Sequence, residues 1–166
     1  MSEKSVEKEK LPPLYIVVRI KGIPGRKPEE RKTLELLRLH KKFHAVLVRA
    51  TPSIKGMLKV VEYVVTYGEI DEETLALLLE RRGRLTGNKR VTKEYLEKIG
   101  FKDFRELARA ILEGKVDIRK LPDFKPVFRL HPPSGGFKGS IKKHYREGGE
   151  LGYRGPAINE LIKRMA

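Results

Sequence analysis

The sequence predicts a mixed fold in which strands and helices alternate up to about Ile70 and helices follow. Two patterns carry this prediction. Apolar runs rich in β-branched residues, at 15–20, 45–48 and 64–70, suit strands with at least one buried face. Segments with apolar residues at helical spacing lie between them, and a proline stands at each helix start. Alternating strands and helices would by default suggest parallel pairing of the strands.

Composition indicates a polyanionic partner. With 166 residues, of which 39% are hydrophobic, the chain can fold into one or two small domains. It carries 37 Lys and Arg against 22 Asp and Glu, a formal charge of +15, which favours nucleic acid first and an anionic membrane surface second. No apolar run approaches the roughly 18 residues of a spanning helix, and residues 1–13 read as a solvated, poorly ordered charged tail. The absence of cysteine excludes disulfides, Cys-based zinc sites and thiol catalysis.

The first strand, Tyr15 to Ile20, leads into a basic loop and then a helix. Pro28 and the two glutamates after it suit the first turn of that helix. Its apolar face is predicted to consist of four leucines: Leu34, Leu36, Leu37 and Leu39.

A second helix is expected after the strand at 45–48. Thr51 is placed to be the N-cap and Pro52 the first helical residue. An apolar stripe should face the sheet: Ile54, Met57, Leu58 and Val61. The free amides of Ser53 and Ile54, beside Lys55, could seat a phosphate. A cap with a buried face and no ligand explains the same residues equally well.

Four helices are predicted beyond Ile70. Asp71 caps the first, which carries Leu75, Leu77, Leu78 and Leu79 and ends at Gly83. The linker at 83–90 is basic, and it could touch phosphates or be a plain solvated connection. The second helix starts at Thr92, with Val91 and Leu96 spaced as a hydrophobic staple, and the third starts at Asp103 with a capping box. A closing helix follows Pro156, with the stripe Ile158, Leu161 and Ile162.

The stretch from His131 to Gly155 is the least globular in composition. It holds seven glycines and few aliphatic residues, with aromatic side chains among lysines and arginines. Such a segment is too poor in apolar residues to offset the entropy of ordering it. We therefore expect an RNA-contacting loop that is mobile in the free protein and orders only on RNA, with a flexible linker as the alternative.

Charge is also segregated along the chain. Residues 19–59 contain twelve basic residues against three glutamates, whereas residues 62–80 contain six acidic residues and no basic one. This pattern favours a basic binding surface with an acidic back, although a charge run is also typical of a merely solvated face. No catalytic motif accompanies it: the four histidines lack metal-ligand spacing, and no phosphate-binding loop or nucleophile elbow occurs. An RNA-processing or RNA-modifying enzyme, or its non-catalytic RNA-binding subunit, is kept as the alternative.

The segment YIVVRIKGIPGRKPEERKTLELLRLHKKFHAVLVRATPSIKGMLKVVEYVVTYGEI resembles the core of the large-ribosomal-subunit protein family called L-thirty in bacteria and L-seven in eukaryotes. RATPSIKGM, at Arg49 to Met57, is its most specific part. The longer C-terminal part, with HPPSGGFKGSIKKHYREGGELGYRG, resembles the archaeal and eukaryotic members, and the lack of a long basic N-terminal extension favours the archaeal type.

The resemblance implies an α+β fold with a ferredoxin-like βαβαβ core at 14–70, in which a three-stranded, mainly antiparallel sheet carries two helices on one face. A flexible charged tail at 1–13 precedes it. A helical extension at 71–166 with the basic Gly-rich loop at 131–155 follows. The implied function is a structural constituent of the large subunit that is not an enzyme and uses no cofactor or metal.

The implied partners are large-subunit rRNA of the 23S type and neighbouring large-subunit proteins, with no membrane and no small-molecule substrate. Proximity to 5S rRNA is left open. The implied location is cytoplasmic, on the ribosome. Candidate RNA-contacting residues are basic, aromatic or at the start of a helix, and they comprise Arg19, Arg26, Lys27, Arg31, Lys32, Lys41, Lys42, Arg49, Thr51, Ser53, Lys55, Arg84, Lys89, Arg90, Arg129, His131, Lys138, Lys142, Lys143, His144, Tyr145, Arg146, Tyr153 and Arg154.

Overall fold

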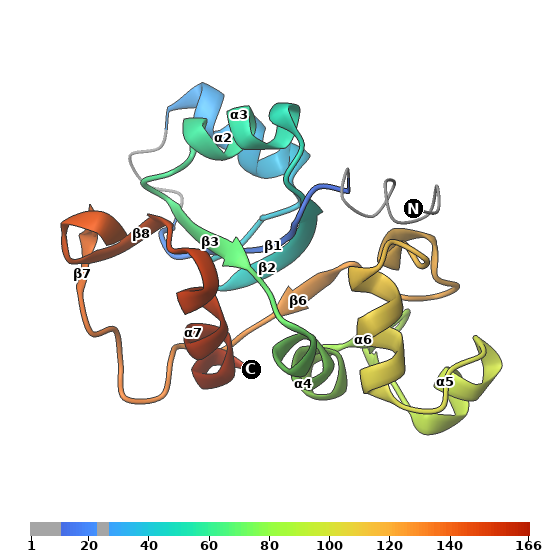
Figure 1. The fold of residues 1–166 in the computed structure, drawn as a ribbon. Coiled ribbons are helices and arrows are strands. Elements are labelled where there is room, and N and C mark those ends of the chain that lie inside the picture. The colour runs from blue at the N-terminus through green and yellow to red at the C-terminus, as the bar shows by residue number, and fades with distance from the viewer. Residues whose placement is uncertain (1–10, 23–26) are drawn as a thin grey trace, which may run out of the picture.

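The computed structural model describes residues 11–22 and 27–166, and it shows a mixed α/β fold with helices on both faces of one large sheet (Figure 1). The strands are β1 (Leu14–Arg19), β2 (His44–Arg49), β3 (Val65–Glu69), β4 (Arg84–Leu85), β5 (Lys89–Arg90), β6 (Val127–Arg129), β7 (Ser140–His144) and β8 (Gly149–Tyr153). The helices are α2 (Pro28–Leu36), α3 (Pro52–Val60), α4 (Glu72–Arg82), α5 (Lys93–Lys98), α6 (Phe104–Leu112) and α7 (Ile158–Met165), and the short 3-10 turns are η1 (Ile118–Lys120), η2 (Tyr145–Glu147) and η3 (Gly155–Ala157).

The main sheet has six strands in the order β6-β2-β1-β3-β8-β7. Strand β1 pairs antiparallel with both β2 and β3, as the resemblance implied and contrary to the default of parallel pairing. The expected three-stranded sheet is too small, because the chain after Ile70 adds β6 beside β2 and the parallel strands β8 and β7 beside β3. The extension is therefore not only helical, and it widens the sheet at both sides.

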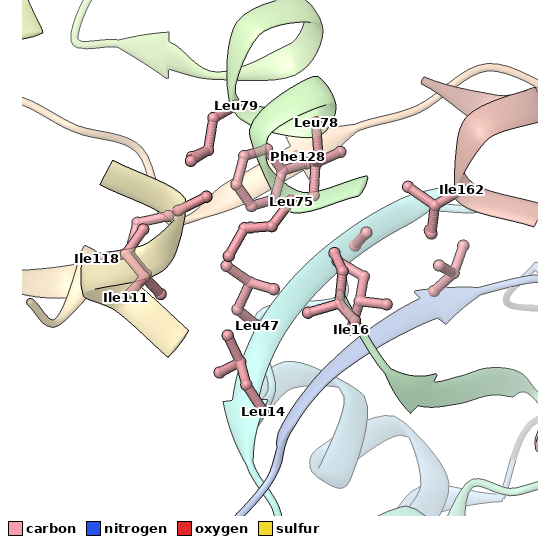
Figure 2. Packing of buried hydrophobic residues seen from close by; sticks show 14 of the residues in the cluster. Leu14, Ile16, Leu47, Leu75, Leu78, Leu79, Ile111, Ile118, Phe128 and Ile162 are labelled. Atoms are coloured by element: carbon pink, nitrogen blue, oxygen red, sulfur yellow. The ribbon is translucent and has the colours of Figure 1, made fainter. Parts of the chain in front are cut away.

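Strand β1 is buried along its whole length because helices cover both faces of the sheet. Tyr15 and Val17 face the layer of α2 and α3, where they pack with Leu34, Leu58 and Val61. Successive strand residues point to opposite faces. The alternate residues of β1, Ile16 among them, therefore face the second layer, where α4, α6 and α7 supply a larger cluster that also takes in Phe128 of β6 (Figure 2).

The predicted helix starts are confirmed. Thr51 Oγ1 accepts a hydrogen bond from the Ile54 amide (3.3 Å), and Asp71 Oδ1 accepts one from Thr74 (2.7 Å). Thr92 and Asp103 cap α5 and α6 in the same way. Gly83 is the C-cap of α4, and α7 begins at Ile158 and buries the predicted stripe. Each of these signals depends on residues within a few positions of one another.

One helix face was predicted wrongly. Helix α2 ends at Leu36, whose side chain is 66% exposed, while Leu37 and Leu39 are buried from the turn that follows the helix. Arg38 adopts a left-handed conformation in this turn (φ 63°), which reorients the chain so that the buried leucines are not on one helical stripe.

The expectation for residues 131–155 is contradicted at its C-terminal half. Strand β8 is buried from Gly149 to Gly152 and pairs with β3. Because β8 contains two glycines, a buried glutamate and only one buried apolar side chain, Leu151, its composition does not show that it belongs to the sheet. Close packing of its backbone replaces the missing apolar side chains: a Cβ at Gly149 or Gly152 would overlap the Lys143 backbone or the His144 ring.

Candidate nucleic-acid interface

One end of the sheet gathers exposed basic side chains from three elements. Val18 pairs with Ala45, and His44 pairs with Arg129, so the carboxyl ends of β1 and β6 meet the amino end of β2. The turn before β2 is fastened there, because the Phe43 amide donates to the Arg19 carbonyl (2.7 Å) and the Leu130 amide donates to the Phe43 carbonyl (3.1 Å). We call this region the cationic end, and its exposed side chains are Arg31, His40, Lys41, Lys42 and Arg129.

The electrostatic environment of His44 shows that this end is positively charged. Burial lowers the pKa of His44, and the nearby charges of Arg129, Lys41, His40 and Arg19 lower it further. Every charge in that set is basic. His44 Nδ1 is buried and has no hydrogen-bond partner in the described part of the chain. A proton on this ring is therefore disfavoured until an anion approaches.

Helix α2 and the turn after it form a cleft beside this end. A cavity of about 300 Å³ is lined by Arg31, Glu35 and His40 together with Leu34, Leu39 and Arg19. His40 was not among the sequence-predicted candidates. The run His40-Lys41-Lys42 is the sequence signal that could have included it, since all three side chains are exposed on one turn.

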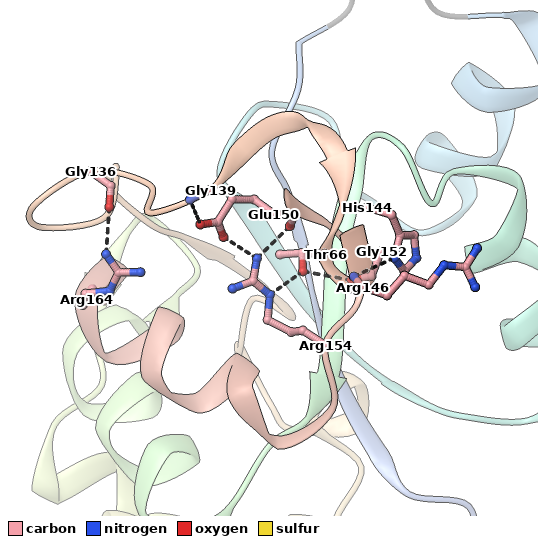
Figure 3. Close-up of polar contacts among 9 residues, drawn as sticks. All are labelled: Thr66, Gly136, Gly139, His144, Arg146, Glu150, Gly152, Arg154 and Arg164. Carbon is pink, nitrogen blue, oxygen red and sulfur yellow. Dashed lines mark hydrogen bonds and ion pairs between the residues drawn. The ribbon is translucent and has the colours of Figure 1, made fainter. Parts of the chain in front are cut away.

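Aromatic stacking joins the loop before β7 to the cationic end. The rings of Phe43 and Phe137 stack with centroids 6.4 Å apart, and Lys42 Nζ lies 5.2 Å from the Phe43 centroid. The same loop is held against α7, because Arg164 Nη1 donates to the Gly136 carbonyl (2.7 Å; Figure 3). The first half of the stretch 131–155 thus lies beside the cationic end, although it contains little regular structure.

A second basic group lies on the outermost strand of the sheet. Lys142 and Lys143 are exposed on β7, and Arg146 is exposed on η2. Tyr145, on the same turn, is 40% exposed and lies under the Arg154 guanidinium, 5.0 Å from ring centroid to Cζ. Lys138 pairs with Glu160 at 2.9 Å, but both side chains are largely exposed, so water and salt screen this pair strongly.

Four of the predicted RNA-contacting arginines are used inside the fold instead. Arg19 is buried and donates to the carbonyls of Lys21 and Leu39 (2.8 Å each). Arg49 donates to the carbonyls of Pro12, Ile111 and Leu112, and Arg84 to those of Arg81 and Gly83. Arg154 is buried between Glu150 and Thr66 (Figure 3). Because these guanidinium groups donate to backbone carbonyls within the fold, we leave these positions out of the interface we propose.

Both predicted histidines and one tyrosine also have structural partners. His144 is buried, and its Nδ1 accepts from the Arg146 amide (3.3 Å). His131 Nε2 lies 3.0 Å from the carbonyl oxygen of Ala166, which fixes the end of α7. The Tyr153 hydroxyl donates to Glu69 Oε1 at 2.6 Å, and that hydrogen bond, with burial and the Glu69 charge, raises the pKa of Tyr153 to about 12.

The remaining candidates do not gather at the cationic end. Thr51 is half-buried as the cap of α3, and it lies at the opposite end of β2 from His44, as do Ser53 and Lys55. Lys89 and Arg90 are exposed on the separate β4-β5 hairpin. Arg26 lies outside the described residues, and Lys27 and Lys32 are exposed on or next to α2.

Metal clusters and membrane-spanning helices do not occur among the described residues. Within residues 11–22 and 27–166, no cluster of three or more His, Asp or Glu side chains could hold a metal ion. In the same ranges, no helix combines the length and apolar character needed to cross a bilayer.

A sheet end that gathers exposed cations is typical of proteins that bind nucleic acid. Comparison with known proteins agrees with this class. Residues 15–65 match the family described as "Ribosomal protein L30p/L7e". The chain is 61% identical over 153 residues to the "Large ribosomal subunit protein uL30" of Thermofilum pendens, covering 92% of this chain and 98% of that protein.

Further archaeal relatives of the same description match equally broadly. The protein of Hyperthermus butylicus is 55% identical over 174 residues, covering 99% of this chain and 96% of its own length. That of Archaeoglobus fulgidus is 52% identical, covering 92% and 99%. The chain belongs to the L30p/L7e family of ribosomal proteins, and its relatives confirm the long, archaeal-type form inferred from the sequence.

Proposed function

We propose that this chain holds large-subunit rRNA through its cationic end, as a structural constituent of the large ribosomal subunit. Family membership makes it a ribosomal protein with a structural rather than catalytic role, which sets aside the alternative of an RNA-processing or RNA-modifying enzyme. The partners we propose are 23S-type rRNA and neighbouring large-subunit proteins. The location we propose is the cytoplasm, on the ribosome.

The observation that carries the proposal is the convergence of exposed cations on a rigid support. Lys41, Lys42 and Arg129 are exposed, yet their backbones are fixed by pairing of β2 with β6 and by the bonds of the Phe43 turn. Cations on a preorganised backbone lose less conformational freedom when they meet a phosphate than cations on a mobile tail. Each phosphate that they neutralise releases condensed counterions, which makes the binding depend steeply on salt.

The second basic group, on β7 and η2, would extend this surface. Lys142, Lys143 and Arg146 are exposed, and Tyr145 offers an exposed ring face for a base. Two patches on one rigid body could hold separate RNA segments in a fixed relation, and phosphate contacts of this kind position RNA without reading its sequence.

Salt dependence tests the proposal. If six to ten phosphates are contacted, affinity for large-subunit rRNA should fall by about three to five powers of ten between roughly 50 and 200 mM salt. Replacing Lys41, Lys42 and Arg129 together by alanine should reduce the slope of log affinity against log salt by about 1 for each phosphate that the variant no longer binds.

A matched control removes the same charge elsewhere. Lys93, Lys98 and Lys102 are exposed on or near α5, away from the sheet. Their triple alanine variant should keep the wild-type slope. Equal slopes for both triple variants would contradict the assignment of the cationic end.

Sedimentation with the large subunit, lost on ribonuclease treatment, tests the function itself. Crosslinks from Lys42 to rRNA would show whether 5S rRNA also lies near.

A further inference from the structure

An apolar groove runs along the outer edge of β2, on the opposite half of that strand from the cationic end. Two cavities of about 340 and 330 Å³ lie there, and both are lined by Leu47, Val48, Ile54 and Arg119. We call the two together the β2 groove. It continues from the end of α2 past the start of α3 towards the end of α6, since Leu36 and Met57 line the first cavity and Ile111 lines the second.

The strand edge beneath the groove extends past its neighbour. Strand β6 covers β2 only as far as the pair Val46 and Val127. In the same register, Pro126 would stand opposite Leu47, and a proline nitrogen has no hydrogen to donate. Leu47 to Arg49 therefore extend beyond β6, and an added strand could pair with this edge in line with β6.

The side chains around this edge are apolar with a basic rim. Leu36 is 66% exposed and lines the first cavity together with other apolar residues. Arg38 and Arg119 are the charged residues that line the first cavity. Arg119 pairs with Asp117 at 3.4 Å, but the arginine side chain is 67% exposed, so this pair is weak and can exchange for another carboxylate.

We propose that the β2 groove docks an extended segment of a neighbouring protein in which apolar and acidic residues alternate. This inference rests on the proposed function, because the neighbour belongs to the same subunit. In an extended segment successive side chains point to opposite sides, so apolar residues can enter the groove while carboxylates meet Arg38 and Arg119. RNA is the poorer occupant, since interfaces with nucleic acids are more polar and more strongly basic than this lining.

Single-cysteine labelling in assembled subunits tests the proposal. The chain has no cysteine of its own, so Leu36→Cys introduces one reactive thiol in the groove. Val60→Cys is the matched control, because Val60 is an exposed apolar residue (47%) on α3 and lines neither cavity. Maleimide should label both free variants readily. In subunits, labelling of Leu36→Cys should slow by at least about tenfold. A factor of ten corresponds to about 1.4 kcal/mol of free energy by which the bound segment protects the thiol.

A benzophenone maleimide attached at the same thiol then identifies the occupant. An adduct that survives ribonuclease and contains an apolar, acidic segment of a second protein is the expected result. An adduct to RNA, an adduct to a basic segment, or unslowed labelling in subunits would overturn the proposal. Subunits that contain neither the variants nor the wild-type protein would instead contradict the proposed function. Met57→Cys, on the other wall, repeats the test if Leu36→Cys alone is excluded from subunits.

Discussion

Replacing Arg154 by alanine should destabilise the whole domain, although the residue lies in a stretch whose composition indicates a mobile loop. Arg154 Nη2 donates to Glu150 Oε2 at 2.6 Å, and both side chains are 5% exposed. The same guanidinium donates to the Glu150 carbonyl (2.7 Å) and to Thr66 Oγ1 (2.8 Å) on β3. It therefore fastens β8 to β3.

The size of the effect follows from the burial of the pair. Removing one partner of a buried ion pair leaves an uncompensated charge and costs about 3 to 5 kcal/mol. For a protein of this length each kcal/mol lowers the melting temperature by about 2 to 4 °C, so a fall of roughly 6 to 20 °C is expected. Replacing both partners, as Glu150→Leu with Arg154→Met, should cost less than Arg154→Ala alone, because no charge is left buried.

Denaturant unfolding and native-state amide exchange together check this. The midpoint should fall in Arg154→Ala, and the amides of Gly149 to Tyr153 in the wild type should exchange as slowly as those of Ala45 to Val48. A change of less than about 1 kcal/mol in the free energy of unfolding, together with fast exchange in β8, would refute the reasoning, since neither fits a buried pair. Such a result would support the mobile loop that composition predicts for this stretch.

The acid dependence of stability gives an independent test of the same pair. Burial alone would raise the pKa of Glu150, but hydrogen bonds from Arg154 and the Gly139 amide and the Arg154 charge outweigh it, so the pKa is lowered. A lowered pKa in the folded state stabilises the protein above the ordinary carboxyl pKa, and this contribution is lost as the pH falls through the folded value. Glu150→Gln should remove that part of the acid dependence, measured by unfolding across acidic pH.

Two further predictions concern the glycines of β3 and α3 and the tyrosine of β8. Gly68→Ala should destabilise the protein severely, because the new Cβ would overlap the backbone of Gly155. Gly56→Ala should instead stabilise it by about 0.5–1 kcal/mol, since the space around Gly56 is open and alanine favours a helix. Comparable melting temperatures for the two variants would contradict these expectations. Tyr153→Phe should remove a tyrosine ionisation near pH 12 from the spectrophotometric titration. Because the pKa of Tyr153 is raised, its hydrogen bond to Glu69 stabilises the fold below about pH 10 and loses that effect as the pH rises through about 12.

Local signals explain why much of the fold could be predicted from the sequence. Thr51, Asp71, Thr92 and Asp103 cap helices through bonds to amides three residues away, so a few neighbouring positions contain the whole interaction. The strands β1 and β2 are similarly marked by continuous apolar runs, because helices cover both faces of the sheet. The capping box predicted at Asp103 differs from the usual form in one hydrogen bond. Glu106 Oε2 accepts from the amide of Lys102, one residue before the cap (3.2 Å).

Pairings between distant residues could not be predicted in this way. Strand β8 pairs with β3 across more than eighty positions, for example Thr66 with Gly152, and it contributes only one large apolar side chain, Leu151, to the core. Its stability comes from backbone packing and from the pair of Glu150 and Arg154, and neither gives a hydrophobic periodicity. A glycine-rich, charged strand is therefore indistinguishable by composition from a solvated loop.

The same limit applies to the candidate interface, because the sequence does not separate cations that bind within the fold from cations that are exposed to a partner. Arg19, Arg49, Arg84 and Arg154 donate to carbonyl oxygens in the fold, whereas Lys41 and Lys42 are exposed at the cationic end. A guanidinium presents several donors in a fixed plane and can join separate chain segments, while an ammonium on a flexible stem is a strongly hydrated point charge that stays in water. Part of the net charge of +15 therefore stabilises the protein itself. The salt dependence of RNA binding should follow the number of exposed cations at the interface rather than the total charge, which is why the two triple variants, equal in charge, should differ in slope.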